Sequence, residues 1–421
     1  MEQVLVTGIG VVLPGAVGAE EFWKNLREGR SQIGFLTRFD PGVLPVRLAA
    51  EIKGFDHTGL LPGLPAEHAA KYTREIRIAM SAVADAMRDA GLDRATAGVD
   101  PARIGLITSS SRGPLEWWHE AMPNMDEAGP GAPFGDSGAM LRGLPGCPAT
   151  MAAIHCDIRG LVTTLSSACV GGNHAIGMAL HELRAGCADA MLVGGHEFPI
   201  LPGVVKSYLA LGDGVLSRED SDPATAMKPY DARRDGMVLG EGAVVLCLER
   251  AESARARGAR AYAEVVAHRA INEASHPTTM DLSGKRTRDV ILDVLAASRR
   301  GPDDIDYICG HGTATRYNDI AESRAVAALY PERPPARWPP LSSVKPVYGH
   351  CLGVSGVVNV AATALMIRHG CLVPTINYQV PDPECDHDHV SEGARRADVG
   401  FAVSLSFAFG SQTSVVSLAA A

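Results

Sequence analysis

The sequence lacks the paired cysteines that mark a disulfide framework or a zinc site. Its nine cysteines are odd in number, lie scattered along 421 residues and never form a C-x-x-C motif. Disulfide-rich secreted domains and zinc ribbons both need such spacings, so both classes are excluded. Scattered free thiols are typical of a reducing compartment, and we therefore predict a cytoplasmic protein.

The sequence also lacks a basic stripe, a signal peptide and a long apolar run. Its formal net charge is −9, and without rows of Lys and Arg to hold phosphates a nucleic acid is a poor partner. The N-terminal stretch MEQVLVTGIG has no basic region before its apolar residues, unlike a signal peptide. The apolar segment 357–367 is too short to span a bilayer, which predicts a core helix and no membrane insertion.

Two apparent ligand motifs do not fit the chemistry they resemble. In the stretch TGIGVVLPG, Leu13 replaces the third glycine of a dinucleotide fingerprint. In CDHDHVS (385–391), alternating Asp and His side chains on an extended segment would point to opposite faces, and no second cluster accompanies them. We predict a solvated turn at 385–391 and no metal site.

Strand-like runs alternate with helical patterns, which predicts an α/β fold. The predicted strands are 3–12, 103–110, 161–168, 189–195, 242–250, 261–271 and 305–310, with the last strands starting in 399–409, and the clearest predicted helices are 20–29, 76–91, 288–301 and 354–370. The alternation restarts near residue 250. This order of elements, rather than a visible repeat, predicts two similar halves.

Cys169 lies in the stretch LSSACVGGNHAIG, between a predicted strand and a predicted helix that ends at Gly186. The unpaired N–H groups and the positive end of a helix stabilise a thiolate, which predicts a pKa below the usual value of about 8.5. The same N–H groups can hold an oxyanion. The position therefore favours a nucleophile, although a free thiol that only packs in the core is the alternative.

Three more side chains stand at glycine-rich junctions where a ligand can approach. His311 follows a predicted strand in CGHGTAT, and His350 precedes a predicted helix in SSVKPVYGHCLGVSG, with Lys345 five residues before it. Taken singly, a structural histidine or a surface lysine is the simpler interpretation. Phe409, at the glycine turn of SLSFAFGSQTS, fits either a gate or the core.

Seven motifs in order resemble those of the β-ketoacyl-[acyl-carrier-protein] synthases of the condensing-enzyme (thiolase) superfamily, and most closely the synthase II type. The motifs are VLVTGIGVVLPG, SSACVGGNHAIG, KPYDARRDGMVLGEGAVVLCLE, CGHGTAT, SSVKPVYGHCLGVSG, PTINYQVPDPECD and SFAFGSQTS. The resemblance implies a duplicated, thiolase-like α/β fold in five α-β-α-β-α layers, usually as a homodimer. Residues 1–250 would form the half with the nucleophilic cysteine, and 251–421 the half with the histidines and the lysine.

By motif match, Cys169 would be the acylated nucleophile, and His311, His350 and Lys345 would complete the catalytic set. The resemblance also implies supporting roles for further residues: an oxyanion hole from the backbone N–H groups of Cys169 and Phe409, a gate at Phe409, pantetheine contacts at Thr313 and Thr315, a buried counter-charge at Glu322, and support from Phe407. A catalytically dead chain-length factor lacks the cysteine, which is present here.

The activity so implied is that of a ketosynthase, an acyltransferase of fatty-acid or polyketide biosynthesis. An acyl group passes from an acyl carrier protein to Cys169, and a malonyl-type thioester then loses carbon dioxide and attacks it. Substrates arrive on the phosphopantetheine of the carrier, so no metal or redox cofactor is expected, since decarboxylation drives the bond formation.

The sequence departs from the family at three places. The usual G-F-G-G-T-N loop is AFGSQT here (408–413), so Ser411 replaces a glycine and a positive φ would be costly. Asn318 replaces the glycine before Asp319. Arg112 aligns with an apolar acyl-pocket residue and favours a short, polar or anionic acyl group.

These departures favour a specialised polyketide or fatty-acid-like pathway. They leave two alternatives: intramolecular C–C closure (cyclisation) of a carrier-tethered chain, and a non-catalytic assembly subunit. The four catalytic-type residues together argue against the second alternative.

Overall fold

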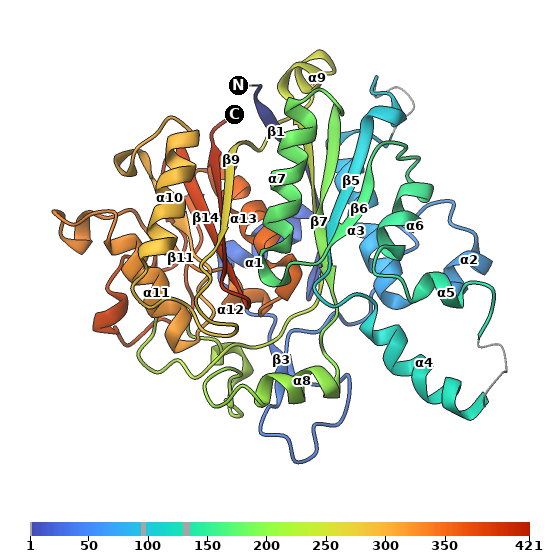
Figure 1. Cartoon of the computed structure of the whole chain (residues 1–421), viewed down its shortest axis with the longest axis horizontal. Helices are drawn as coiled ribbons and strands as arrows, with labels where there is room; N and C mark the ends of the chain where they lie inside the picture. Colours follow the sequence, from blue (N-terminus) through green and yellow to red (C-terminus); the bar gives the residue numbers. More distant parts are fainter. Residues whose placement is uncertain (1, 94–97, 129–134) are drawn as a thin grey trace.

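Two sets of five strands build the central sheet of the computed structural model, which describes residues 2–93, 98–128 and 135–421 (Figure 1). The first set runs in the order β1-β8-β7-β5-β6 and the second in the order β9-β15-β14-β10-β11. The strands are β1 (Val4–Leu13), β5 (Ile104–Ser109), β6 (Val162–Leu165), β7 (Ala190–Glu197), β8 (Gly242–Arg250), β9 (Ala263–Asn272), β10 (Tyr307–Cys309), β11 (Leu341–Ser342), β14 (Phe401–Ala408) and β15 (Gln412–Ala419). Short strands flank them: β2 (Ala16–Val17), β3 (Gly34–Phe35), β4 (Leu48–Ala49), β12 (Cys371–Leu372) and β13 (Arg395–Arg396).

The two sets have the same strand directions. β8 is antiparallel to β1 and β7, and β5 is parallel to β7 and β6. In the second set β15 is antiparallel to β9 and β14, and β10 is parallel to β14 and β11. The sets join where β1 pairs with β9. The predicted duplicated α/β fold is therefore confirmed.

Helices lie outside and between the two sets (Figure 1). α3 (Arg74–Ala90) packs on β1 and β8, and α10 (Lys285–Ala297) packs on β9 and β15. Between them α7 (Gly171–Arg184) and α13 (Ser355–His369) each contact strands of both sets. The other helices are α1 (Ala19–Glu28), α2 (Ala66–Lys71), α4 (Leu115–Ala128), α5 (Ala139–Arg142), α6 (Cys147–His155), α8 (Pro202–Leu209), α9 (Ala251–Ala256), α11 (Arg316–Ala327) and α12 (Lys345–Tyr348).

The glycines of the opening TGIG stretch serve packing. A Cβ on Gly8 would lie 2.3 Å from the backbone oxygen of Ala86, and one on Gly10 would lie 2.0 Å from that of Ala82. Glycine at both positions lets α3 approach β1 closely. The helix begins at a Thr73 cap that accepts a hydrogen bond from the Ile76 N–H, and it ends at Gly91 in the left-handed region.

The apolar helix α13 is a core helix, as predicted. The window Leu352–His369 is long and apolar enough to cross a membrane, but 83% of it is buried inside the protein. It contacts strands of both sets, so its apolar surface is used in the core.

Asp231 joins the loop between α8 and β8 to the loop between β12 and β13. Its buried carboxylate accepts hydrogen bonds from the backbone N–H groups of Gln379 (2.6 Å) and Val380 (2.7 Å) and from Arg233 Nε (2.8 Å). Burial raises the pKa of this carboxyl, but these hydrogen bonds outweigh it and hold the pKa well below its usual range. The carboxylate therefore stabilises the fold above about pH 4, and this contribution is lost as the pH falls.

We expect Asp231→Asn to lower the free energy of unfolding by about 3 kcal/mol, because an amide cannot accept from all three donors and leaves Arg233 without its counter-charge. Urea unfolding at pH 7 measures the loss. Asp213→Asn is the matched control, since that side chain is 85% exposed and pairs with the exposed Arg218; its effect should stay within about 0.5 kcal/mol. Equal stability of the two variants would contradict the role given to Asp231.

Candidate active site

Cys169 lies where the chain leaves β6 and enters α7. β6 ends at Leu165, three residues earlier than the sequence predicts, because Ala168 takes a φ of +46° and a 3₁₀ turn over Ala168–Val170 follows. The Cys169 side chain is buried, at 7% exposure. The strand-to-helix turn predicted for this residue is present.

The glycine pair after Cys169 allows close packing of the first turn of α7. A Cβ on Gly171 would lie 2.0 Å from Ser109 Oγ at the end of β5, and one on Gly172 would lie 2.6 Å from Val357 Cγ2 of α13. The pair therefore lets the chain just after Cys169 pack between the end of β5 and the helix α13.

The prediction of a lowered cysteine pKa is wrong. Burial raises the pKa of Cys169 to about 12, and the positive charges of Lys345 and Arg112 lower it only in part. The sequence showed the helix terminus but not the depth at which the sulfur lies. The resting thiol is therefore neutral and must lose its proton as it attacks.

We expect the alkylation of Cys169 by iodoacetamide to accelerate about tenfold per pH unit up to pH 10, without a plateau, because only the thiolate reacts. Peptide mapping at each pH measures the rate at Cys169 itself. Cys187 is exposed and serves as an internal control. A plateau at Cys169 below pH 8 would show that the thiol is activated in the empty site.

His311 follows β10 and is held at both ends of its backbone. Lys345 Nζ lies 3.3 Å from His311 Nδ1 and also donates to the His311 backbone oxygen. Glu322 accepts from the His311 N–H (2.6 Å), the Gly312 N–H (3.0 Å) and the hydroxyl of Tyr230 (2.8 Å). Lys345 and Glu322 thus contact opposite ends of the same residue.

Burial shifts the pKa values of both Glu322 and Lys345. Burial raises the pKa of Glu322 to about 7, although its hydrogen bonds oppose the rise. Burial also lowers the pKa of Lys345, and Glu322 opposes that change. An ammonium that donates to His311 Nδ1 leaves the proton of the neutral ring on Nε2, so that nitrogen can donate a hydrogen bond to a substrate.

His350 faces His311. The ring centroids are 5.3 Å apart and the rings are nearly perpendicular, at 85°. His350 donates its backbone N–H to the Val238 oxygen (2.7 Å), and its Nδ1 lies 2.8 Å from Ser355 Oγ. Burial, followed by the charge of Lys345, lowers the pKa of both rings well below the usual value, so both are neutral near pH 7.

Phe407 lies near the end of β14, and Phe409 lies in the turn between β14 and β15. Phe407 is buried, with its ring 5.5 Å from that of His311, and Phe409 is 37% exposed with its ring 6.1 Å from that of Tyr208. The neighbouring Ala408 packs against the apolar cluster that contains Cys169. The strand pair thus brings the Phe409 backbone to the cysteine side of the site.

Ser411 adopts the backbone conformation of the glycine it replaces. Its φ is +57°, in the left-handed region, and its hydroxyl bonds the backbone oxygen (2.6 Å) and N–H (3.0 Å) of His276. The Gly410 N–H also donates to the Pro277 oxygen (2.7 Å). The turn is therefore tied to the 276–277 loop.

Thr313 and Thr315 lie just beyond His311, with their hydroxyl oxygens 2.8 Å apart. Asp319 accepts from the Thr313 N–H (3.0 Å) and from Asn318 Nδ2 (3.0 Å). Asn318, which replaces a glycine, thus helps to hold Asp319 beneath this loop.

Sequence reasoning missed three residues of the site. Ser355 orients His350, Tyr230 bonds Glu322, and Tyr208 packs in the apolar cluster of Cys169. Tyr230 lies in the motif KPYDARRDG and Ser355 lies five residues after His350, so both were in motifs already noticed. Tyr208 lies in none of these motifs, so only its packing in the folded chain shows that it belongs to the site.

The prediction of a solvated turn at 385–391 is wrong. His387 and His389 are 8% and 2% exposed, and His389 stacks on Tyr230 with centroids 4.3 Å apart. Their ring nitrogens contact the backbone oxygens of Ser323, Leu341 and Cys385. Over the part of the chain that is described, no group of His, Cys, Asp and Glu is suited to a metal ion.

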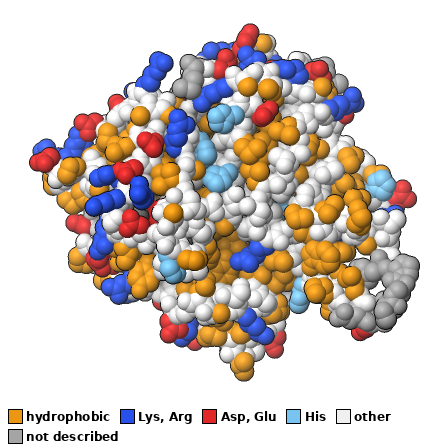
Figure 2. Space-filling model, viewed as in Figure 1, with side chains coloured by type: hydrophobic (Ala, Val, Ile, Leu, Met, Phe, Trp, Pro, Cys, Tyr) orange, Lys and Arg blue, Asp and Glu red, His pale blue; other side chains and the backbone are white. Residues whose placement is uncertain are grey.

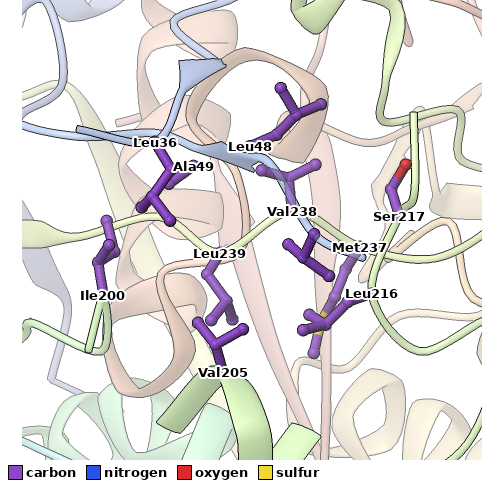
Figure 3. Close-up of a pocket in the computed structure, with 11 residues that line it drawn as sticks. Leu36, Leu48, Ala49, Ile200, Val205, Leu216, Ser217, Met237, Val238 and Leu239 are labelled. Atoms are coloured by element: carbon purple, nitrogen blue, oxygen red, sulfur yellow. The ribbon is translucent and has the colours of Figure 1, made fainter. Parts of the chain in front are cut away.

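Figure 3 shows a narrow apolar pocket. Its walls come from the β3–β4 region, from α8 and the residues just before it, and from the segment 216–239, and Ser217 is the polar exception among the lining residues. The lining residues are Leu36, Val46, Leu48, Ala49, Ile200, Val205, Leu216, Ser217, Met237, Val238 and Leu239. Several belong to the apolar cluster of Cys169, so the pocket is part of the packing that supports the cysteine.

Models of one family match most of this chain. The model described as the N-terminal domain of β-ketoacyl synthases matches residues 1–254, and that of the C-terminal domain matches 262–379.

Comparison with individual proteins also finds ketosynthases. A putative polyketide β-ketoacyl synthase 1 of Streptomyces halstedii is 36% identical over 422 residues, covering 99% of this chain and 97% of the relative. A 3-oxoacyl-[acyl-carrier-protein] synthase 2 of Synechocystis is 35% identical over 412 residues, with 97% and 96% covered. A solved type II polyketide ketosynthase, bound to its acyl-carrier protein and a hexaketide, superposes with a TM-score of 0.88 at 29% identity, with both chains fully covered.

Proposed function

This chain belongs to the β-ketoacyl synthase family, and we propose that it condenses two carrier-bound acyl units through Cys169. It is a ketosynthase of the type found in type II polyketide synthases. Three observations support the assignment to Cys169, Lys345, His311 and His350. All four side chains are buried, Lys345 and His350 both contact His311, and Lys345 is close enough for its charge to lower the pKa of Cys169.

The first step is acyl transfer. Cys169 Sγ attacks the thioester carbonyl of an acyl group, the carrier thiol leaves with the proton, and an acyl-cysteine remains. The backbone N–H groups of Cys169 and Phe409 would hold the oxyanion, and the loss of one such donor costs about 3 kcal/mol. The neutral Cys169 thiol fits this step if its proton leaves as the thioester is attacked.

The second step is decarboxylative condensation. A malonyl-type thioester loses carbon dioxide, and its carbonyl oxygen gains the charge of an enolate. Neutral His311 and His350 would donate N–H groups to that oxygen. The enolate carbon then attacks the acyl-cysteine, the Cys169–acyl bond breaks, and a β-ketoacyl thioester leaves. The Cys169 sulfur departs as a thiolate and takes a proton from water, which restores the neutral thiol. No electrons are gained or lost, so the reaction as written needs no redox cofactor.

The partner is an acyl carrier protein, which presents both substrates on phosphopantetheine. The solved relative bound to its acyl-carrier protein supports this. The paired hydroxyls of Thr313 and Thr315, beside His311, would bind the pantetheine arm. We also propose a cytoplasmic location, because the nine cysteines are free and the nucleophile must stay reduced.

We propose that the two halves, 1–250 and 251–421, are the units of the fold and that the protein forms a homodimer. Each half contributes one of the five-strand sets. β6 is an edge strand that, over the described residues, pairs with β5 alone. Figure 2 shows hydrophobic side chains gathered on the face over α4, α5 and α6, beside this edge, and Leu161, just before β6, is 44% exposed. An open edge with apolar neighbours is suited to pairing with a second copy.

We expect Leu161→Arg to shift the protein from a dimer to its monomer mass of 44.3 kDa in light scattering, because a charge on the edge strand opposes pairing. Leu292→Arg on α10 is the matched control, since Leu292 is 39% exposed on a different face. A wild type that is monomeric at micromolar concentration would contradict the proposed homodimer.

Incubation of the protein with acyl-carrier and malonyl-carrier thioesters tests the function. We expect carbon dioxide and a β-ketoacyl product in equal amounts, with an acyl mass on Cys169 in the absence of the malonyl substrate. Product without carbon dioxide would instead favour cyclisation, and neither product nor acyl-enzyme would favour a non-catalytic subunit.

A further inference from the structure

Arg112 and Cys169 follow the carboxyl ends of two neighbouring strands, β5 and β6. β5 and β6 are parallel neighbours with Ser109 opposite Leu165, so the segments that leave them run side by side. The Ser110 N–H donates to the Leu165 oxygen (3.0 Å), and Ser166 Oγ donates to the Ser111 oxygen (3.2 Å). These bonds tie the loop that carries Arg112 to the loop that carries the nucleophile.

Arg112 is an exposed residue whose side chain packs on Tyr208 and keeps donors free for a ligand. Its Nη2 lies 3.2 Å from the Tyr208 hydroxyl, and its guanidinium carbon lies 5.3 Å from the centroid of the Tyr208 ring. In the described parts of the chain the ion pairs found do not include Arg112. A guanidinium has five N–H donors, so most of them remain available.

Tyr208 connects this guanidinium to the site. The tyrosine is 3% exposed, belongs to the apolar cluster of Cys169 and faces the Phe409 ring. Arg112 is also close enough for its charge to lower the pKa of Cys169. These contacts of Tyr208 therefore place Arg112 and Phe409 on the same side of the site as the cluster of Cys169.

A nearby carboxylate does not satisfy Arg112. Glu197 is buried, and its Oε2 accepts from Ser111 N–H (2.8 Å), Ser111 Oγ (2.5 Å) and Gly353 N–H (3.2 Å). An alkyl chain next to Arg112 would remove water from the guanidinium without replacing its hydrogen bonds, which is costly. A carboxylate or ketone oxygen would replace them.

We propose that Arg112, with the hydroxyl of Tyr208, selects acyl groups that carry a hydrogen-bond-accepting oxygen a few atoms from the thioester. This rests on the proposed acylation of Cys169 and names the substrate class of that site. The oxygen can belong to a carboxylate, as in a dicarboxylic half-thioester, or to a ketone, as in an oxoacyl chain.

Three pantetheine thioesters of matched shape test the proposal: hexanoyl, 5-oxohexanoyl and glutaryl, which differ in the group at carbon 5. The rate of Cys169 acylation is followed by intact mass. We expect the wild type to prefer the two oxygenated groups over hexanoyl by about 10- to 100-fold, the size of one hydrogen bond to a charged group. A preference for glutaryl alone would assign a carboxylate, and a preference for both would include ketones.

Variants at the two residues separate recognition from packing. Arg112→Leu should lower the ratio of oxygenated to hexanoyl rates by about tenfold or more, with Arg112→Gln as a second variant should the leucine variant fold poorly. Arg112→Lys should retain part of the glutaryl preference, and Tyr208→Phe should reduce the ketone preference a few-fold.

An unchanged ratio in a folded Arg112→Leu or Arg112→Gln protein, or a wild type that prefers hexanoyl, overturns the proposal while leaving the ketosynthase function intact. A wild type that accepts none of the three thioesters, nor any carrier-bound acyl group, overturns both.

Discussion

Replacing Cys169 with alanine should abolish the acyl-enzyme and lower condensation by at least about 10³-fold, because no other group at the site can form the thioester. The change removes one buried atom at a position that is 7% exposed, so the free energy of unfolding should fall by only about 1 kcal/mol. Intact mass after incubation with acyl-carrier protein measures the loss of the acyl-enzyme, and quantification of the product measures the loss of condensation.

Cys147→Ala is the matched control for this variant. Cys147 is buried at 5% exposure but packs in a different apolar cluster, with α3 and α6. This variant should acylate and condense at the wild-type rate within a factor of about two. Product formation by Cys169→Ala from both substrates would rule out the mechanism.

Replacing Lys345 with methionine should slow decarboxylation by about 10²-fold or more while Cys169 is still acylated. Without the ammonium 3.3 Å from its Nδ1, the neutral His311 ring can place its proton on either nitrogen, and the N–H aimed at the enolate is no longer ensured. The loss of one such donor costs about 10²–10³ in rate. Carbon dioxide release from malonyl-carrier protein measures this step, and intact mass measures acylation separately.

The pH dependence of the same step provides a second measurement. Burial lowers the pKa of Lys345, so decarboxylation in the wild type should fall on the alkaline side as the ammonium loses its proton, and Lys345→Met should lack that decline. Lys206→Met on the exposed face of α8 should keep both rate and profile. A wild-type rate of decarboxylation in Lys345→Met would show that Lys345 only fills space.

The elements around the site were largely predictable because each depends on local sequence. The strands 104–109 and 242–250 follow from apolar β-forming runs, and α13 follows from an apolar segment that ends at Gly370. The turn at Cys169 followed from a strand, a cysteine and two glycines. Local periodicity failed at the end of β6, where Ala168 adopts a positive φ, and at α10, which spans Lys285–Ala297 and not the predicted 288–301.

The burial of side chains was not predictable in the same way. The sequence placed 385–391 in solvent, yet His389 is stacked on Tyr230, which is far from it in the sequence. The helix terminus at Cys169 predicted a low pKa, but the depth of the sulfur outweighs it. Both errors have the same cause. The desolvation of a side chain depends on which residues surround it in the folded chain, and many of these are distant in the sequence.

The linear order of residues was enough to specify the chemistry of this protein: a thiol at a strand-to-helix turn, two imidazoles and an ammonium beside glycines, and alternating elements that form layers. Only the folded chain established which groups meet. Lys345 reaches His311 across 34 residues and Arg112 reaches Tyr208 across 96, after two like-ordered strand sets join at β1 and β9. Contacts of this kind depend on the packing of distant segments, and no local pattern in the sequence records them.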